Sequence, residues 1–245
     1  MPNGKDPYLS IVFPAYNEAD KIEKNLTTII SFFDKKDFPY EVVVVEDGSK
    51  DKTLTILQTM AQKFPQLRVL ANSKNMGKGA SVKKGILATR GKFILFSDAD
   101  LATPIAEFDE FLPYLEKGFD IVIGSRWLPS SNVECKQKFT RRFFGNCFYF
   151  LIHHFVLPGI TDTNCGFKAY RRKAAREIFQ KQKLSRWGFD TELLFIARKK
   201  GFKIKEVPVS WFAVETSTVK IKRAIFETLI ELFKIKLNSW RGVYD

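Results

Sequence analysis

The sequence is poor in cysteine and histidine, with three Cys and two His among 245 residues. The cysteines Cys135, Cys147 and Cys165 are odd in number and widely spaced, and no His and Cys cluster has the spacing of a zinc site. This pattern argues against a disulfide framework and against a structural zinc domain. We interpret the three residues as free thiols in a reducing compartment.

The chain also lacks internal boundaries. No linker rich in Pro, Gly or Ser, no low-complexity tract and no internal repeat divides it, and its length allows one sizeable α/β core. The residues before the first apolar run include Lys5 and Asp6 and lack the apolar stretch of a signal peptide. We therefore expect a single domain, residues 1–245, in a protein that stays in the cytosol or faces it.

Acidic residues are scarce in the second half. Residues 1–135 hold 17 Lys and Arg against 18 Asp and Glu, whereas residues 136–245 hold 23 against 9, so the whole positive excess lies there. A basic excess is typical of nucleic-acid binding, of an anionic membrane surface or of a solvated face. Because no recognised nucleic-acid motif is present, we expect no nucleic-acid partner and favour the membrane surface.

Charged residues are absent from Phe143 to Thr161, directly after the basic segment 136–142. The length approaches a bilayer span, but the adjacent His153 and His154 are costly in lipid, so we expect no transmembrane helix. The pattern favours a helix lying on the membrane surface, with a core helix as the alternative. A second amphipathic helix is expected at about 220–240, where helical spacing fits core packing equally well.

Apolar runs of strand length alternate with helix-period segments in the first half. We expect strands at 9–13, 41–45, 67–71 and 92–96, with helices after the first three. The repetition of strand, polar loop and helix predicts a Rossmann-like, mostly parallel α/β sheet whose loops gather along one edge. Ligands of open α/β sheets bind at that edge.

A distinctive loop follows each of these strands. The residues of interest in the four loops are Pro14, Tyr16 and Glu18, then Asp47, then Lys78 between two glycines, then Asp98, Ala99 and Asp100. Each loop alone is also explained by a turn or a helix cap. Two carboxylates one residue apart suit a nucleotide diphosphate held through a divalent cation, with the second carboxylate left for ribose or sugar hydroxyls.

Together these loops resemble the inverting glycosyltransferases of family 2, which have the GT-A nucleotide-sugar-binding fold. Segments 162–168 (DTNCGFK) and 186–194 (RWGFDTELL) are similar to those of dolichyl-phosphate and other polyprenyl-phosphate β-glucosyltransferases. The likeness extends over about residues 9–240. Related mannosyl-phosphate enzymes carry Gln two residues after the second Asp, where this chain has Ala102, and this departure argues against a mannosyl donor.

The resemblance implies a metal-dependent transfer of glucose or N-acetylglucosamine from a UDP-sugar to a polyprenyl phosphate at the cytosolic membrane face. Residues 1–130 would bind the nucleotide sugar, and residues 131–245 would bind the acceptor and face the membrane. The implied nucleotide-sugar contacts are Pro14, Tyr16, Glu18, Asp47, Lys78, Asp98, Ala99 and Asp100. Asp100 would hold Mg²⁺ or Mn²⁺, and Lys78 with the backbone amides around Gly77 and Gly79 would offset the leaving diphosphate charge.

Arginines are the candidates for the acceptor phosphate, because a guanidinium binds phosphate through two donors. We expect Arg126, together with Arg141 or Arg142, in this role. A surface ion pair is the alternative for Arg126, and a solvated basic turn for the other two.

The sugar pocket is expected to include Trp187, Asp190 and Glu192. Asp190 would orient sugar hydroxyls or accept a proton, so it joins Asp100 and Arg126 as a catalytic candidate. For Asp190 the alternative is an acidic charge that stabilises a helix amino terminus. For Trp187 the alternative is simple core packing.

Three other functions remain open. A family 2 enzyme with a saccharide acceptor would need a well-placed base, whereas a polyprenyl phosphate is already an anion. A sugar 1-phosphate nucleotidyltransferase would have a glycine-rich loop after the first strand, and residues 14–18 contain no glycine. A non-catalytic nucleotide-sugar-binding membrane protein is disfavoured by the intact Asp98 and Asp100. The pattern leaves the oligomeric state open.

Overall fold

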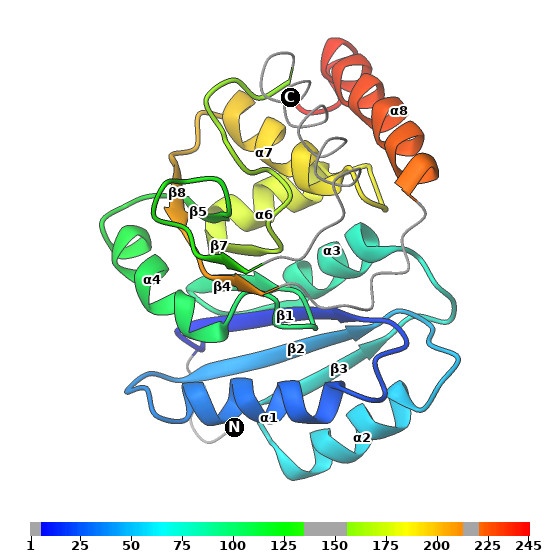
Figure 1. Ribbon diagram of the computed structural model, residues 1–245, viewed down its shortest axis with the longest axis vertical. Helices are drawn as coiled ribbons and strands as arrows, with labels where there is room; N and C mark the ends of the chain where they lie inside the picture. Colours follow the sequence, from blue (N-terminus) through cyan, green and yellow to red (C-terminus); the bar gives the residue numbers. More distant parts are fainter. Residues whose placement is uncertain (1–5, 135–155, 213–220) are drawn as a thin grey trace.

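The computed structural model describes residues 6–134, 156–212 and 221–245, without the side chains of 221–228. Its centre is a seven-stranded sheet in the order β3-β2-β1-β4-β7-β5-β8 (Figure 1). The strands are β1 (Leu9–Ala15), β2 (Tyr40–Glu46), β3 (Leu67–Ala71), β4 (Phe93–Ser97), β5 (Ile121–Ser125), β7 (Phe167–Arg171) and β8 (Ile204–Pro208). The four strands predicted in the first half are confirmed, as is the mostly parallel α/β sheet.

Helices cover both faces of the sheet. They are α1 (Ile22–Phe33), α2 (Thr53–Lys63), α3 (Lys78–Ala88), the 3₁₀ turn η1 (Ile105–Glu107) with α4 (Phe108–Glu116), α6 (Arg172–Lys181), α7 (Phe189–Lys199) and α8 (Ile221–Trp240). In Figure 1, α1 and α2 lie on one side of β1 to β3 and α3 lies on the other. None of the described helices is long and apolar enough to cross a bilayer.

Two hydrophobic clusters follow from this layering. In β2, Val42 and Val44 point into the cluster beneath α1, α2 and α4, whereas Val43 points into the cluster beneath α3, α6, α7 and α8. Successive side chains of a strand face opposite sides of a sheet, so a run of valines fills both clusters. Each fully buried valine contributes about 1.5–3 kcal/mol to folding, which explains why these runs form the central strands.

One strand runs against the others. Among the seven described strands of this sheet, β7 alone is antiparallel to its neighbours β4 and β5. Pairing of Phe96 with Lys168 and of Ser97 with Phe167 brings the amino end of β7 to the carboxyl end of β4. The segment 162–166 therefore reaches the edge at which the loops of the first half gather, which periodicity in the sequence did not predict.

A short ribbon lies beside the same edge. It consists of β6 (Val133–Glu134) and β9 (Trp211–Phe212), which pair in parallel. The backbone amide of Phe212 donates to the carbonyl of Ala102 at 2.8 Å, which attaches the ribbon to the loop after β4. Because β5 lies between β7 and β8, the two halves of the sequence share one sheet. A division into a nucleotide-sugar half and an acceptor half stays a prediction.

Candidate active site

The loops after β1 and β2 are joined by hydrogen bonds. The Asn17 amide donates to Ser49 Oγ at 3.0 Å, and the Lys50 amide donates to Asn17 Oδ1 at 2.9 Å. The Glu18 amide donates to Thr53 Oγ1 at 2.9 Å, which ties the first loop to the start of α2. These bonds support the residues on either side of Asn17, namely the exposed Tyr16 and the half-buried Glu18, at the edge of the site.

Asp47 organises the loop between β3 and α3. This buried carboxylate accepts the side-chain amide of Asn72 at 2.8 Å and the backbone amides of Met76 and Gly77 at 2.9 Å each. The Gly77 amide is therefore bonded within the protein, and a contact between the diphosphate and the amides around Gly77 and Gly79 stays a prediction. The adjacent Lys78, at the first residue of α3, is presented by a loop that Asp47 holds in shape.

The carboxylates after β4 lie among other charges. Asp98 Oδ1 is 2.7 Å from Lys78 Nζ. Asp100 accepts the amide of Ala102 at 3.0 Å, and burial together with the charge of Asp98 raises the pKa of Asp100. Burial and the charge of Asp100 likewise raise the pKa of Glu18. Burial is the larger cause of both shifts, and the mutual repulsion of these neighbouring carboxylates, which adds to it, is what a bound cation would relieve.

A glycine makes room for the Asp98 carboxylate. Gly166 lies just before β7, and its carbonyl accepts the backbone amide of Asp98 at 3.1 Å. A Cβ added at Gly166 would lie 2.0 Å from Asp98 Oδ2, far inside van der Waals contact. The reversed strand β7 and the acidic loop after β4 therefore form one unit of the site.

Two lysines and two aspartates form a charged cluster at the centre of this edge. Asp190, in the first turn of α7, is 2.5 Å from Nζ of the fully buried Lys168. Burial raises the pKa of Asp190 despite the opposing charges of Lys168 and Lys78. Burial also disfavours the charged form of Lys78, but Asp98 and Asp190 outweigh it and raise its pKa, so this lysine is protonated. The cluster combines charges of both signs from α3, the loop after β4, β7 and α7.

The predicted sugar-pocket residues Trp187, Asp190 and Glu192 do not face the same way. The Trp187 side chain is 46% exposed, and its ring lies 6.0 Å from Lys78 Nζ, beside the charged cluster. Glu192 is fully buried and accepts the backbone amides of Lys183 and Leu184 and the hydroxyl of Tyr244.

Successive helical residues are separated by about 100°, so residues 190 and 192 diverge by about 200°. The contacts of Glu192 are those of an anchor for the loop between α6 and α7, and its contact with a sugar stays a prediction.

That loop also supports α3. The carbonyl of Ser185 accepts the amide of Ala80 at 3.2 Å, and Gln182 Nε2 donates to the carbonyl of Gly79 at 2.9 Å. A Cβ added at Gly77 would lie 2.5 Å from the Ser185 carbonyl oxygen. Glu192 therefore supports the position of Lys78 indirectly, because it anchors the loop that packs against the start of α3.

Arg126 follows β5 and forms a two-point pair with Asp162. Its Nε and Nη2 are 2.7 and 2.9 Å from the two carboxylate oxygens, and its guanidinium carbon lies 5.5 Å from the Trp211 ring centre. Burial opposes the charged form, but Asp162 outweighs it and raises the pKa of Arg126. Arg126 in turn holds the pKa of Asp162 below its usual range, although burial alone would raise it. The ion pair that was the alternative interpretation of Arg126 is therefore present, between a half-buried arginine and a buried aspartate.

Several predicted residues cannot be located. Arg141, Arg142, His153 and His154 lie outside the described residues, as does almost all of the segment expected to form a membrane-surface helix. Conversely, Lys168, Asp162 and Gly166 were not assigned roles from the sequence. All three belong to the DTNCGFK segment, so the motif itself was the available signal.

The residues around Asp100 fit a cation that arrives with a nucleotide. Among the described residues, no group of three or more His, Cys, Asp and Glu side chains is arranged to hold a metal ion. Carboxylate oxygens suit Mg²⁺ or Mn²⁺, and Mg²⁺ commonly takes one or two carboxylates with the remaining ligands from phosphates and water. Asp100, with its raised pKa beside Asp98 and Glu18, meets that description.

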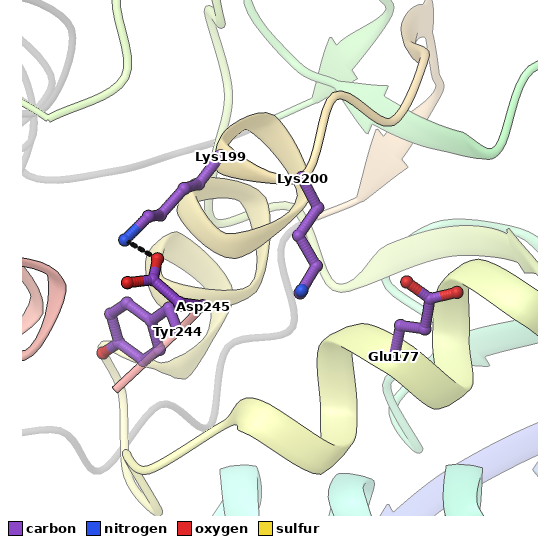
Figure 2. Close-up of a pocket in the computed structure, with 5 residues that line it drawn as sticks. All are labelled: Glu177, Lys199, Lys200, Tyr244 and Asp245. Atoms are coloured by element: carbon purple, nitrogen blue, oxygen red, sulfur yellow. Dashed lines mark ion pairs between the residues drawn. The ribbon is translucent and has the colours of Figure 1, made fainter. Parts of the chain in front are cut away.

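A pocket of about 270 Å³ lies elsewhere, at the far end of α7 (Figure 2). It is lined by Glu177, Lys199, Lys200, Tyr244 and Asp245, and Lys199 pairs with Asp245. Asp190 and Lys199 are nine residues apart on α7, a separation of about 14 Å at 1.5 Å per residue. The pocket is therefore separate from the charged cluster.

Comparisons with known proteins agree with this geometry. The model of the family described as "Glycosyl transferase family 2" matches residues 10–179. A dolichyl-phosphate β-glucosyltransferase of Trichomonas vaginalis is 39% identical over 251 residues, covering 97% of this chain and 73% of that protein. A dolichyl-phosphate β-glucosyltransferase of Dictyostelium discoideum is 36% identical over 249 residues, covering 97% and 76%.

A solved structure supports the fold. Glucosyl-3-phosphoglycerate synthase of Mycobacterium tuberculosis, in complex with Mn²⁺, UDP and glucosyl-3-phosphoglycerate, superposes with a TM-score of 0.68. Identity is 21%, with 93% of this chain and 78% of that chain covered. The family match includes β1 to β5, β7 and the loops that carry Asp47, Lys78, Asp98 and Asp100. This chain therefore belongs to glycosyl transferase family 2.

Proposed function

We propose that the chain transfers glucose from UDP-glucose to a polyprenyl phosphate of the dolichyl type, with inversion at the anomeric carbon and with a divalent cation. Relatives at 32–39% identity are named dolichyl-phosphate β-glucosyltransferases. The observation that carries the proposal is the meeting of Lys78, Asp98 and Asp100 with Lys168 and Asp190 at one sheet edge. Such a cluster combines negative groups for a cation and sugar hydroxyls with positive groups for a diphosphate.

Donor binding is assigned to the loops after the first four strands. Asp100, with Asp98 and Glu18 nearby, would hold Mg²⁺ or Mn²⁺, which supplies positive charge to the diphosphate when bound. Lys78 would exchange its contact with Asp98 for the diphosphate and stabilise the charge on the leaving UDP. The exposed Tyr16 and the carboxylate of Asp47 are proposed to contact the uracil or ribose.

Transfer then requires alignment more than base catalysis. An oxygen of the acceptor phosphate forms the new bond to the anomeric carbon while the bond from that carbon to the diphosphate oxygen breaks. The attacking oxygen is already anionic, so no proton has to be removed. Asp190 would orient sugar hydroxyls, and Arg126 would orient the acceptor phosphate through the edge of its guanidinium not taken by Asp162.

The proposed membrane contact is an exposed apolar stripe on α8. We define the α8 stripe as Leu229, Ile230, Phe233 and Trp240, all exposed; Phe233 is 64% and Trp240 is 79% exposed. Their spacing places them within about 100° of the helix circumference. The buried Leu232 and Ile235 occupy a different side and pack in the cluster with α7. Exposed Lys234 flanks the stripe, as expected at an anionic lipid surface.

The activity is tested by incubating the protein with polyprenyl phosphate, Mn²⁺ or Mg²⁺ and a panel of labelled nucleotide sugars. We expect a β-linked glucosyl lipid from UDP-glucose. Transfer only to a soluble saccharide would instead favour the alternative family 2 reaction, and absence of any turnover would favour a binding protein.

The cation is tested with Asp100→Asn and with a chelator. Both should remove most turnover while the protein stays folded, because an amide cannot balance the charge of cation and diphosphate. Asp37→Asn, an exposed substitution between α1 and β2, is the matched control and should retain activity. Full activity of Asp100→Asn, or full activity in chelator, would remove the cation from the proposal.

The membrane contact is tested by sedimentation with anionic vesicles. Phe233→Ser with Trp240→Ser should weaken binding at all salt concentrations, because burial of apolar surface is not screened. Binding of parent protein should also weaken as salt rises, because each basic residue near the surface contributes about 1 kcal/mol that salt screens. Equal binding of parent and double variant would exclude the α8 stripe from the contact.

A further inference from the structure

The helix that carries the apolar stripe is bonded directly to the active-site loop. Glu231 lies between Ile230 and Leu232 on α8, and one of its carboxylate oxygens accepts the backbone amide of Gly188 at 2.7 Å. Gly188 is the N-cap residue of α7, immediately before its first residue Phe189. It separates Trp187, whose ring lies beside Lys78, from Phe189 and Asp190.

The contact leaves no room for a side chain at position 188. A Cβ added at Gly188 would lie 2.8 Å from both Cβ and Oε2 of Glu231. The φ of Gly188 is −76°, which any residue adopts, so the glycine is required here by the close approach of α8 and not by backbone conformation. Glu231 of α8 is therefore in direct contact with the peptide that joins Trp187 to Asp190.

The carboxylate also lies at a favourable electrostatic position. The first backbone amides of a helix have no partner within the helix itself, and this end carries a partial positive charge. A negative group from another helix at this end holds the first turn of α7, and that turn contains Asp190.

We propose that Glu231 is a positioning residue that couples the seating of α8 on a lipid surface to the geometry of residues 185–190. Burial of the α8 stripe fixes the helix, and through Glu231 it fixes Trp187 and Asp190 relative to Lys78 and Lys168. The acceptor is itself a lipid, so alignment of the sugar pocket is completed where the acceptor resides. This inference rests on the proposed membrane function.

The first test measures hydrogen exchange and does not need activity. Vesicles of phosphatidylcholine and phosphatidylserine should slow exchange of the backbone amides at 185–190 in the parent protein. In Glu231→Ala the slowing should be lost, although sedimentation with the same vesicles is unchanged because the stripe is intact. Vesicle-induced protection that persists in Glu231→Ala would overturn the coupling. Failure of the parent to bind vesicles would overturn it together with the membrane contact.

The second test measures turnover. We expect kcat of Glu231→Ala to fall about tenfold on vesicles, the effect of losing one hydrogen bond to a charged group. Glu231→Gln keeps an acceptor oxygen of similar reach and should restore most of kcat. Gly188→Ala, which forces the two segments apart, should reproduce the loss.

Glu177→Ala on α6 removes a carboxylate outside the site and is the matched control for the same assay. A Gln variant as impaired as the Ala variant, or a Gly188→Ala variant with parental kcat, would contradict the role of this contact. If the parent protein transfers no sugar, the hydrogen-exchange experiment still tests the coupling. Failure of the proposed activity can therefore be told apart from failure of the coupling.

Discussion

Replacing Lys168 with Met should destabilise the protein because it removes the ammonium group that pairs with the buried carboxylate of Asp190. The two side chains have similar length, so packing beneath β7 changes little, but the ammonium 2.5 Å from Asp190 is lost. Both groups are almost completely shielded from water. Removing one partner of a buried ion pair costs about 3–5 kcal/mol, because the other charge is left uncompensated. Because the charge of Lys78 still partly compensates Asp190, we expect the loss in free energy of unfolding to lie at the lower end, about 3 kcal/mol at pH 7.

The loss should depend on pH in a defined direction. Burial already raises the pKa of Asp190, and without Lys168 its folded-state pKa rises further above the value of about 3.9 in an unfolded chain. Above pH 4 the folded variant then binds more protons than the unfolded chain, so its free energy of unfolding falls as pH rises. The deficit relative to the parent protein should be small near pH 4 and full at pH 7.

Urea denaturation of the parent and the variant at pH 4 and pH 7 measures this deficit directly. The double variant with Lys168→Met and Asp190→Leu is the control, because replacing a whole buried ion pair with apolar residues is often neutral. It should recover most of the stability at pH 7 while remaining inactive. An equal deficit at both pH values, with no recovery in the double variant, would show that Lys168 acts through packing and refute the electrostatic account.

Three further outcomes are expected. Asp47→Ala should raise the KM for the nucleotide sugar more than that for the acceptor, because it loosens the loop that presents Lys78; an unchanged donor KM in steady-state kinetics would limit Asp47 to a local turn. Arg126→Lys keeps the charge but loses the two-point pair, so kcat/KM for polyprenyl phosphate should fall about tenfold with donor KM unchanged; parental kinetics would exclude it from acceptor binding. Burial raises the pKa of Cys165 to about 11, so peptide mapping should find it unalkylated by iodoacetamide at pH 8 until the chain is unfolded; rapid labelling of native protein would contradict its burial.

Much of the first half was predictable because its signals are local. The alternation of apolar strands with amphipathic helices predicts parallel pairing, and parallel pairing brings Asp47, Lys78, Asp98 and Asp100 to one edge. The structure confirms this arrangement of the loops, and the prediction needed no knowledge of contacts between distant residues. The helical spacing of Asp190 and Glu192 could also be read from the sequence, and it predicts that their side chains lie on different sides of α7.

The partners of the second-half residues were not predictable in the same way. Arg126 pairs with Asp162, and Asp190 pairs with Lys168, across 36 and 22 positions of sequence. Both pairs exist only because the strand that begins at Phe167 runs antiparallel between two parallel strands. A five-residue apolar strand carries no signal for its direction, so neither pair follows from periodicity.

The position of that antiparallel strand, β7, has a consequence for synthesis of the chain. β5 is complete at Ser125, yet both of its neighbours in the sheet, β7 and β8, come later in the sequence. Until residues 167–171 have emerged from the ribosome, β5 has no partner on either side and β4 has one open edge, and both strands are strongly apolar. Such edges pair readily with other chains, so nascent chains that stop between these points should be especially prone to aggregate and to recruit chaperones.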